Sequence, residues 1–188
     1  MKVLGISGTN GAGKDSIGEM LATRHGWLFI SVSQILRDEL SKQGLPTDRH
    51  HTHRLSAQWR RQSGTGVLID KAMQIYEPQK DRYKGLAISS LRNPGEADEV
   101  HKLGGKVIWI DADINIRYAR VKARQHGRQE DKQSFEEFVS DEQHQMHHSG
   151  DGATLNMSAV KQKADIFIDN SNDNIEKLFK EVEEALGI

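Results

Sequence analysis

The chain of 188 residues contains no cysteine and no long hydrophobic run. The lack of cysteine excludes disulfides, thiolate metal ligands and cysteine nucleophiles, and it is typical of proteins in a reducing cytosol. No apolar stretch approaches the ~20 residues that a membrane-spanning helix needs, and the first residues lack the pattern of a secretory leader. We therefore expect a soluble, cytoplasmic protein with no membrane partner.

Excess charge of either sign is also missing. The 26 Lys and Arg residues nearly balance the 27 Asp and Glu residues, and the formal net charge is −1. This balance gives no sign of a general nucleic-acid-binding surface. The length suits one domain with a well-buried core, so residues 1–188 are expected to form a single domain with one site.

Short apolar runs alternate with longer helical patterns along the chain. This alternation is typical of an α/β fold in which helices cover both faces of a parallel sheet. Strands are expected at residues 2–6, 27–30, 85–89, 106–110 and 165–168. Helices are expected at residues 15–25, 33–43, 52–76, 94–103, 113–125, 134–147 and 173–186.

The most informative segment reads Gly-Thr-Asn-Gly-Ala-Gly-Lys-Asp over residues 8–15, directly after an apolar run. Glycines at 8, 11 and 13 allow backbone N–H groups to face inward, and Lys14 brings a positive charge to the outer phosphates of a nucleoside triphosphate. The helix that follows points its N-terminus at the same phosphates. The predicted ATP-binding residues are Gly8, Thr9, Asn10, Gly11, Ala12, Gly13, Lys14, Asp15 and Ser16.

The residue after the lysine departs from the usual pattern, which has Ser or Thr there to bind Mg²⁺. Here Asp15 stands in that place and Ser16 follows. Either Ser16 supplies the hydroxyl one position later, or the Asp15 carboxylate binds the ion directly or through water. In the third interpretation Asp15 only favours the positive end of the helix dipole.

Two segments resemble the acceptor site of adenylate-kinase-type nucleotide kinases. Residues 29–37 end a strand in small hydroxyl residues and continue into a helix, and residues 86–94 end the third strand. The resemblance implies that Ser33 and Arg37 hold the base or phosphate of the acceptor, and that Arg92 grips its phosphate. Arginine suits this task because its planar fork can donate two parallel hydrogen bonds to phosphate oxygens. The acceptor-binding helical segment is expected at about residues 31–80.

The same family usually has an Asp at the end of the third strand, where it orders Mg²⁺ through water. The matching residue here is Ser89. A carboxylate is thus gained at Asp15 and lost at 89, and we expect Asp15 to compensate. Asp111 and Asp113, which follow the next strand, are the alternative source of this charge.

Residues 117–131 resemble the lid helix and lid of small nucleoside monophosphate kinases. Arg117, Arg120 and Arg124 recur at helical spacing, and Gly127 precedes Arg128. The resemblance implies that Arg120 packs on the ATP base and that Arg124 and Arg128 act as catalytic arginines with Lys14 and Arg92. A lid is expected at about residues 124–157, with a mobile connection over residues 143–156.

The tail over residues 164–186 resembles dephospho-coenzyme A kinases and uncharacterised archaeal nucleotide kinases, the group that the whole chain resembles most. The implied fold is a three-layer α/β/α P-loop kinase with a five-stranded parallel sheet. The implied function is transfer of the γ-phosphoryl of MgATP to a nucleoside or deoxynucleoside monophosphate. Dephospho-coenzyme A kinase is the near alternative, although its hydroxyl acceptor calls for a base and no carboxylate ends the second strand. A non-kinase ATP-binding regulator is the second alternative.

The histidines and tryptophans are expected to have no role in binding. His144 and His148 have helical spacing without the Glu of a zinc-protease pattern, so they and His50, His51, His53 and His147 are interpreted as exposed polar residues. The three tryptophans, Trp27, Trp59 and Trp109, stand in apolar contexts and are expected to pack in the core.

Overall fold

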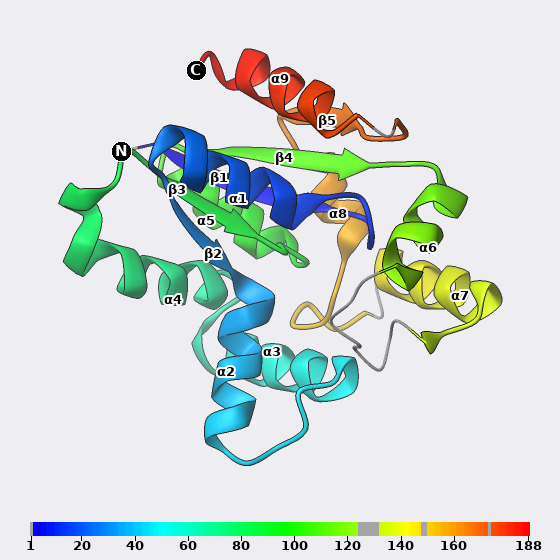
Figure 1. Cartoon of the computed structure of the whole chain (residues 1–188). Coiled ribbons are helices and arrows are strands. Elements are labelled where there is room, and N and C mark those ends of the chain that lie inside the picture. The colour runs from blue at the N-terminus through cyan, green and yellow to red at the C-terminus, as the bar shows by residue number, and fades with distance from the viewer. Residues whose placement is uncertain (1, 124–131, 148–149, 173) are drawn as a thin grey trace.

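A computed structural model describes residues 2–123, 132–147, 150–172 and 174–188. Its strands are β1 (Val3–Gly8), β2 (Leu28–Ser31), β3 (Leu86–Ser89), β4 (Lys106–Asp111) and β5 (Ile166–Asp169). In the described residues all five pair in parallel, in the order β2-β3-β1-β4-β5 (Figure 1). The predicted α/β class and the five-stranded parallel sheet are confirmed.

The helices largely follow the expected ranges. They are α1 (Lys14–His25), α2 (Val32–Lys42), α3 (Arg49–Ser63), α4 (Val67–Tyr76), η1 (Glu77–Arg82), α5 (Pro94–Lys102), α6 (Ile114–Lys122), α7 (Phe135–Met146), α8 (Met157–Gln162) and α9 (Ile175–Leu186). Among the helices described here, none is long and apolar enough to cross a membrane.

The helix predictions were wrong over residues 52–76 and missed two short helices, η1 and α8. The single helix expected over residues 52–76 is divided into α3 and α4, because Gly64 takes the left-handed region at φ 93° and ends α3. The short helix α8 was not predicted at all. Its six residues are fewer than two turns, too few to display a helical period in the sequence.

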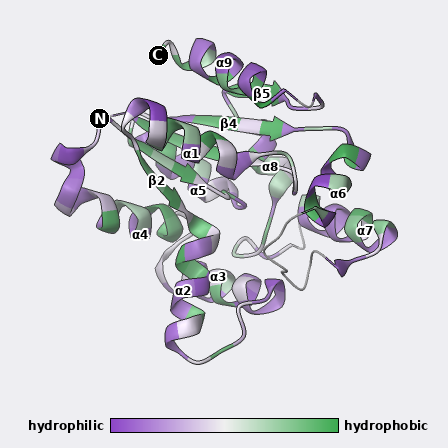
Figure 2. Cartoon of the chain, in the orientation of Figure 1, coloured by the Kyte–Doolittle hydropathy of each residue, from purple (hydrophilic) through white to green (hydrophobic). Residues whose placement is uncertain are grey.

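Two hydrophobic clusters fill the two faces of the sheet. Alternate residues of β4 point to opposite faces, so Val107 and Trp109 join one cluster while Ile108 and Ile110 join the other. Helices α1 and α9 cover the second face, and α4, α5 and α8 cover the first (Figure 1). Figure 2 shows hydrophobic strands at the centre and hydrophilic outer turns on the helices.

The sheet order places a crevice at the end of β1. This strand lies between β3 and β4. The chain continues from β3 into α5 on one face of the sheet, and from β4 into α6 at the strand ends. Ligands of open parallel sheets bind outside the carboxyl ends of the strands, at such a switch point. The predicted phosphate loop leaves β1 at this point, and α2, α3, α6 and α7 surround it (Figure 1).

Candidate active site

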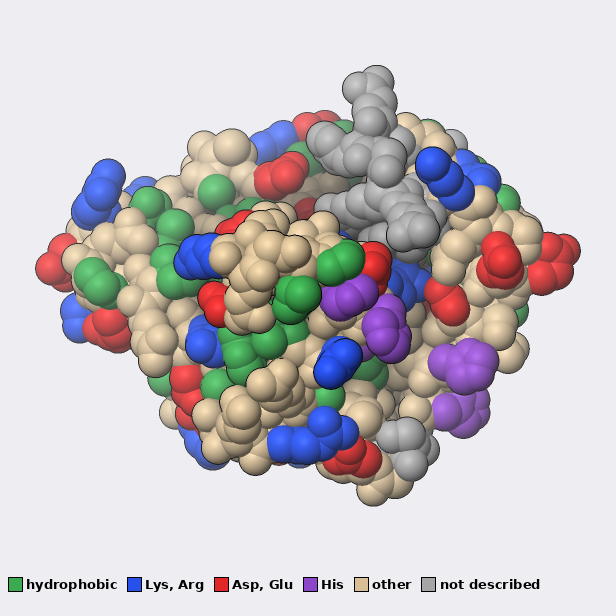
Figure 3. All heavy atoms as spheres, turned by 90° about the horizontal axis from the view of Figure 1, so that it is seen from below, with side chains coloured by type: hydrophobic (Ala, Val, Ile, Leu, Met, Phe, Trp, Pro, Cys, Tyr) green, Lys and Arg blue, Asp and Glu red, His purple; other side chains and the backbone are tan. Residues whose placement is uncertain are grey.

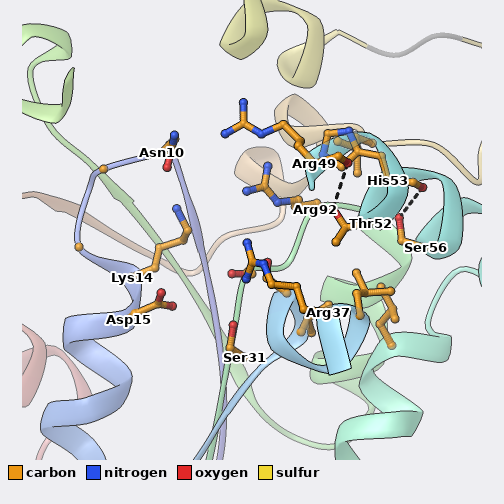
Figure 4. A pocket seen from close by; sticks show the side chains of 18 of the residues that line it. Asn10, Lys14, Asp15, Ser31, Arg37, Arg49, Thr52, His53, Ser56 and Arg92 are labelled. Carbon is orange, nitrogen blue, oxygen red and sulfur yellow. Dashed lines mark hydrogen bonds between the residues drawn. The ribbon is translucent and has the colours of Figure 1, made fainter. Parts of the chain in front are cut away.

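A cavity of about 470 Å³ lies between the loop after β1 and the helices α2 and α3. Figure 4 shows residues from both sides that line it. Positive side chains outnumber negative ones: Asp15 and Glu19 are the lining carboxylates of the described residues. The cationic lining side chains are Lys14, Arg37, Arg49, Arg60, Arg92 and Arg120. The cavity therefore favours a strongly anionic ligand.

The loop after β1 has the geometry of a phosphate cradle. Gly8, Gly11 and Gly13 all have positive φ, at 139°, 82° and 106°. A Cβ atom on Gly8 would lie 1.9 Å from the carbonyl oxygen of Ile110, so no larger residue fits. Gly13 caps α1 without a side-chain hydrogen bond to the first-turn N–H groups, which leaves this helix end suited to an anion.

Side chains brace the loop from both ends. The Lys14 Nζ donates to the carbonyl oxygens of Gly8, at 3.0 Å, and of Thr9, at 2.6 Å. The Thr9 Oγ1 donates to Asp111 Oδ1 at 2.6 Å. Asp111, one of the two alternative sources of the carboxylate missing at position 89, thus anchors the loop. The other, Asp113, caps α6.

Seven of the predicted ATP-binding or metal residues line the cavity: Asn10, Gly11, Gly13, Lys14, Asp15, Ser16 and Arg120. Gly8, Thr9 and Ala12 belong to the same loop but do not line this cavity. Their roles in binding stay predictions.

The two exchanged residues of the sequence are in direct contact. The buried Ser89 Oγ donates to Asp15 Oδ1 at 2.9 Å. The carboxylate that the loop gains and the hydroxyl that replaces a carboxylate at the end of β3 are therefore in contact. Asp15, Ser16 and Ser89 together offer the oxygen donors that Mg²⁺ prefers. Outside the undescribed segments, no group of three or more His, Cys, Asp or Glu side chains could hold a metal by itself.

Arg120, predicted to pack on the ATP base, lines the cavity on the side of β5. Its guanidinium donates to the carbonyl oxygens of Asn170, at 2.9 Å, and Asn172, at 2.8 Å. The Asn170 side chain in turn donates to the carbonyl oxygen of Ala12 at 2.8 Å. The segment after β5 thus links Arg120 to the phosphate loop, a role for Asn170 that the sequence did not indicate.

The opposite wall carries the predicted acceptor residues. Ser33 and Arg37 lie one turn apart on α2, and both line the cavity, as does Arg92. Ser90, between β3 and Arg92, has φ 72°, which is rare for a residue with a side chain and concentrates at functional sites. Figure 4 shows Arg37, Arg49 and Arg92 extended toward Lys14 and Asn10.

Arg49 and His53 were missed in the sequence. They lie four residues apart at the start of α3 and both line the cavity. Such spacing places two residues on one helix face, but nothing local shows which face meets a ligand.

The histidine interpretation is correct only in part. His50, His144 and His147 are exposed, whereas His51 is half-buried against Asp48, at 2.9 Å, and His53 is half-buried in the cavity wall. Figure 3 views the molecule from the side of α2 and α3 and shows histidines among interspersed acidic and basic side chains. His148 lies outside the described residues. Trp27 and Trp109 are buried in the core and Trp59 packs against it, as expected.

The crowded positive charges change the protonation of this wall. Burial, together with the charges of Arg92 and Arg49, lowers the pKa of His53 to about 3, so its imidazole is neutral at pH 7. Burial and the charge of Arg49 lower the pKa of Arg92 to about 10, which leaves its guanidinium charged. The acceptor wall therefore combines charged guanidinium groups with a neutral ring.

A buried ion pair supports the acceptor wall. Arg60 donates to Glu96 Oε1 at 2.6 Å, and both side chains are almost fully buried. The other carboxylate oxygen of Glu96 accepts from the backbone N–H of Arg92 at 2.7 Å and of Asn93 at 3.2 Å. Because one carboxylate holds both α3 and the backbone of Arg92, it keeps the two sides of this wall together.

The mobile connection expected over residues 143–156 stays a prediction, and residues 148 and 149 of it lie outside the described residues. Its first residues belong to α7, and its last are tied to buried groups. Asn93 Nδ2 donates to the carbonyl oxygens of Gly152 and Thr154, both at 2.8 Å, and the backbone N–H of Asn156 donates to Arg92 O at 3.0 Å. The predicted lid residues Arg124 and Arg128 lie outside the described residues.

Comparison with known proteins agrees with this geometry. A family model described as an AAA domain matches residues 4–145. The chain belongs to this family. A UPF0200 protein of Pyrobaculum aerophilum is 24% identical over 188 residues, which cover 99% of this chain and 97% of the relative. A UPF0200 protein of Methanococcus vannielii is 25% identical over 190 residues, which cover 98% of this chain and 100% of the relative.

Solved structures of small-molecule kinases share the fold. Shikimate kinase from Bacteroides thetaiotaomicron matches with a TM-score of 0.62 and 11% identity, covering 99% of this chain and 98% of that one. A gluconokinase from Sinorhizobium meliloti matches with a TM-score of 0.54 and 14% identity, covering 99% and 91%. These matches show that this member of the AAA domain family has the P-loop kinase fold.

Proposed function

We propose that the protein transfers the γ-phosphoryl group of MgATP to a nucleoside or deoxynucleoside monophosphate. The observation that carries the proposal is the arrangement of Arg37, Arg49 and Arg92, which face Lys14 across one cavity (Figure 4). Phosphoryl transfer needs the donor and acceptor held in line and the spreading negative charge neutralised, and little covalent help from the protein. Two facing groups of cations meet this need.

The donor half of the site suits ATP. Inward backbone N–H groups of the phosphate loop, the N-terminus of α1 and Lys14 would hold the phosphates. Asp15 and Ser16 would hold Mg²⁺, with Ser89 orienting the Asp15 carboxylate through their hydrogen bond. When bound, Mg²⁺ neutralises charge on the phosphate oxygens. Arg120 would pack against the base.

The acceptor half suits a phosphate group more than a hydroxyl group. A hydroxyl acceptor must lose its proton to a base, and the carboxylates that line the described cavity, Asp15 and Glu19, both belong to α1 on the donor side. A phosphate acceptor is already ionised and needs no base. It does need charge-assisted hydrogen bonds, which the three arginines offer.

The test is a coupled assay of ADP release over the common nucleoside and deoxynucleoside monophosphates and dephospho-coenzyme A. We expect MgATP-dependent turnover with at least one monophosphate, and loss of that turnover in Lys14→Ala. The Arg92→Ala variant should retain ATP binding while its turnover requires much more acceptor.

Other outcomes separate the alternatives. Turnover of dephospho-coenzyme A alone would overturn the monophosphate assignment and favour a hydroxyl acceptor. Binding of ATP without ADP release for any acceptor would favour a nucleotide-binding regulator. Absence of ATP binding would overturn both the kinase and the regulator.

A further inference from the structure

One turn of α7 contacts arginines on both sides of the cavity. The Arg49 Nη1 donates to Asp141 Oδ2 at 2.7 Å, and Arg92 donates to the side-chain oxygen of Gln145. Between these positions, Glu142 accepts two hydrogen bonds from Arg117, one of them at 2.9 Å. Asp141, Glu142 and Gln145 therefore reach three arginines that come from α3, from the segment after β3 and from α6.

Arg117 carries the contact of α7 to the phosphate loop. Its side chain is buried, and it donates to the carbonyl oxygens of Ala112, at 2.7 Å, and Asn10, at 3.4 Å. Its backbone also packs on the loop, because a Cβ atom on Gly11 would lie 2.6 Å from the Arg117 carbonyl oxygen. Glu142 thus acts on the donor half, whereas Asp141 and Gln145 act on the acceptor half.

The contacts of α7 with Arg49 and Arg92 each occupy one guanidinium nitrogen and leave the other donors for a ligand. A guanidinium has five N–H donors in a rigid fork, so one held nitrogen leaves the others for a ligand. A long arginine side chain that is already ordered loses less entropy when it binds. Gln145 is neutral and does not cancel the charge of Arg92. Asp141 also accepts a hydrogen bond from Gln133 Nε2 at 2.5 Å, so its carboxylate has two donor partners, Arg49 and Gln133.

We infer that α7 is a positioning element for both substrates: Asp141 and Gln145 orient Arg49 and Arg92 toward the acceptor phosphate, and Glu142 orients Arg117 against the phosphate loop. This inference rests on the proposed function. It extends that function to residues that do not line the cavity, because Asp141, Glu142 and Gln145 would act through the arginines that they contact. It predicts that adjacent positions on one helix affect different ligands.

The experiment measures two affinities by calorimetry in the full chain. The first is that of MgADP, and the second is that of inorganic phosphate in the presence of a saturating non-hydrolysable MgATP analogue, which fills the donor half. The variants are Asp141→Leu, Asp141→Asn, Gln145→Leu and Glu142→Leu. Gln143→Leu is the matched control, because Gln143 is exposed on the same helix. Melting temperatures are recorded for all of them.

We expect Asp141→Leu and Gln145→Leu to weaken phosphate binding about tenfold while the MgADP affinity stays within about twofold. Asp141→Asn keeps an oxygen for Arg49 and should restore most of the phosphate affinity. Glu142→Leu should show the opposite pattern and weaken MgADP selectively. The same split should appear in turnover as changes in the KM of acceptor and of ATP.

Three results would overturn the inference. The first is that Asp141→Leu and Gln145→Leu weaken phosphate binding no more than the control Gln143→Leu does. The second is equal weakening of both ligands by every α7 variant, which would indicate a structural role alone. The third is tighter phosphate binding in both Asp141 variants, which would make Asp141 a competitor. Failure of the proposed function looks different: Arg49→Ala and Arg92→Ala would then leave phosphate binding unchanged, and α7 would have no acceptor arginines to position.

Discussion

The two halves of the site are built in different ways. The proposed donor half is built mainly on consecutive residues, 8–16, where Gly8, Gly11 and Gly13 have positive φ angles. The acceptor half consists of side chains: Arg37 from α2, Arg49 from α3 and Arg92 from the segment after β3. Among the loop residues, Lys14, Asp15 and Ser16 line the cavity with side chains proposed to serve the phosphates and Mg²⁺.

This difference indicates which half can be adapted to a different ligand by substitutions. A cradle of backbone groups is common to any sequence that adopts the loop, so it binds a constant ligand such as the phosphates of ATP. A wall of side chains changes with each substitution, so it can be adapted to different acceptors. We expect mutations in the donor half to affect catalysis with every acceptor, and mutations in the acceptor half to affect the acceptor while ATP binding is retained.

The largest effect is expected from Lys14→Ala. This change removes the positive charge at the outer phosphates, and we expect kcat to fall by about 100-fold to 1,000-fold, as for other losses of a preorganised contact to transition-state charge. Measurements of ATP affinity, turnover and melting temperature test this together. Lys42→Ala, at an exposed position, is the control. Unchanged turnover in Lys14→Ala would disprove the assignment of the donor half.

The acceptor half is tested by Arg92→Ala and Arg37→Ala. Each removes charge-assisted hydrogen bonds worth roughly 1.5–3 kcal/mol, so the KM of the acceptor should rise about tenfold to a hundredfold. The KM of ATP should change little. Arg54→Ala, on the exposed face of α3, is the matched control. A selective loss of ATP affinity in either variant would place that arginine on the donor side.

A smaller effect is expected where the halves meet, at Asp15 and Ser89. If Asp15 serves Mg²⁺, then Asp15→Asn should raise the Mg²⁺ concentration needed for half-maximal turnover by about tenfold, a loss of roughly 1.4 kcal/mol. Adding Ser89→Asp should return part of it, because the two side chains lie within hydrogen-bond distance, at 2.9 Å.

Steady-state titration of Mg²⁺ in the two single variants and the double variant checks this prediction. Contacts to a shared ion should be non-additive. If Asp15 only favours the helix dipole, the change is instead about 0.3–1 kcal/mol in stability with an unaltered Mg²⁺ midpoint. Strictly additive effects on turnover would also reject compensation, and Ser16 would then be the preferred metal residue.

The last effect is on stability and not on turnover, and it concerns the neutral ring of His53 in the proposed acceptor wall. The pKa of His53 is about 3 in the folded state, below its usual 6.5. The unfolded chain therefore binds more protons between these values, and the free energy of unfolding falls as the pH falls below about 6.5, by up to about 1.4 kcal/mol per pH unit. The variant His53→Gln should lose less stability than the unmodified protein between about pH 7 and about pH 4.5.

Denaturant unfolding over this pH range measures the difference. His50→Gln, at an exposed position of the same helix, is the control and should follow the unmodified protein. Equal acid sensitivity of His53→Gln and the unmodified protein would show that His53 titrates normally, and hence that burial and the nearby arginines do not lower its pKa.

The sequence by itself determined the conformation of the phosphate loop. Glycine conformation, the strand before the loop and the helix after it are local properties, so residues 8–16 could be assigned from their order alone. Periodicity likewise indicated the five strands and most helices. The carboxylate at Asp15 and the hydroxyl at Ser89 could be noticed from the sequence, because the first departs from the usual phosphate-loop pattern and the second from the pattern of the kinases that the chain resembles.

Only the tertiary structure decided which side chains meet at the cavity. Arg49 and His53 belong to a helix whose cavity face depends on how α3 packs, and Gln145 reaches Arg92 across 53 positions of the chain. The contact of Ser89 with Asp15 spans 74 positions. The hydrogen bonds of residues 152–156 to Asn93 and Arg92 also join segments that are distant in the chain. Local residues set backbone conformation, but the place where side chains converge depends on strand register and helix packing, which arise only when the whole chain buries its core.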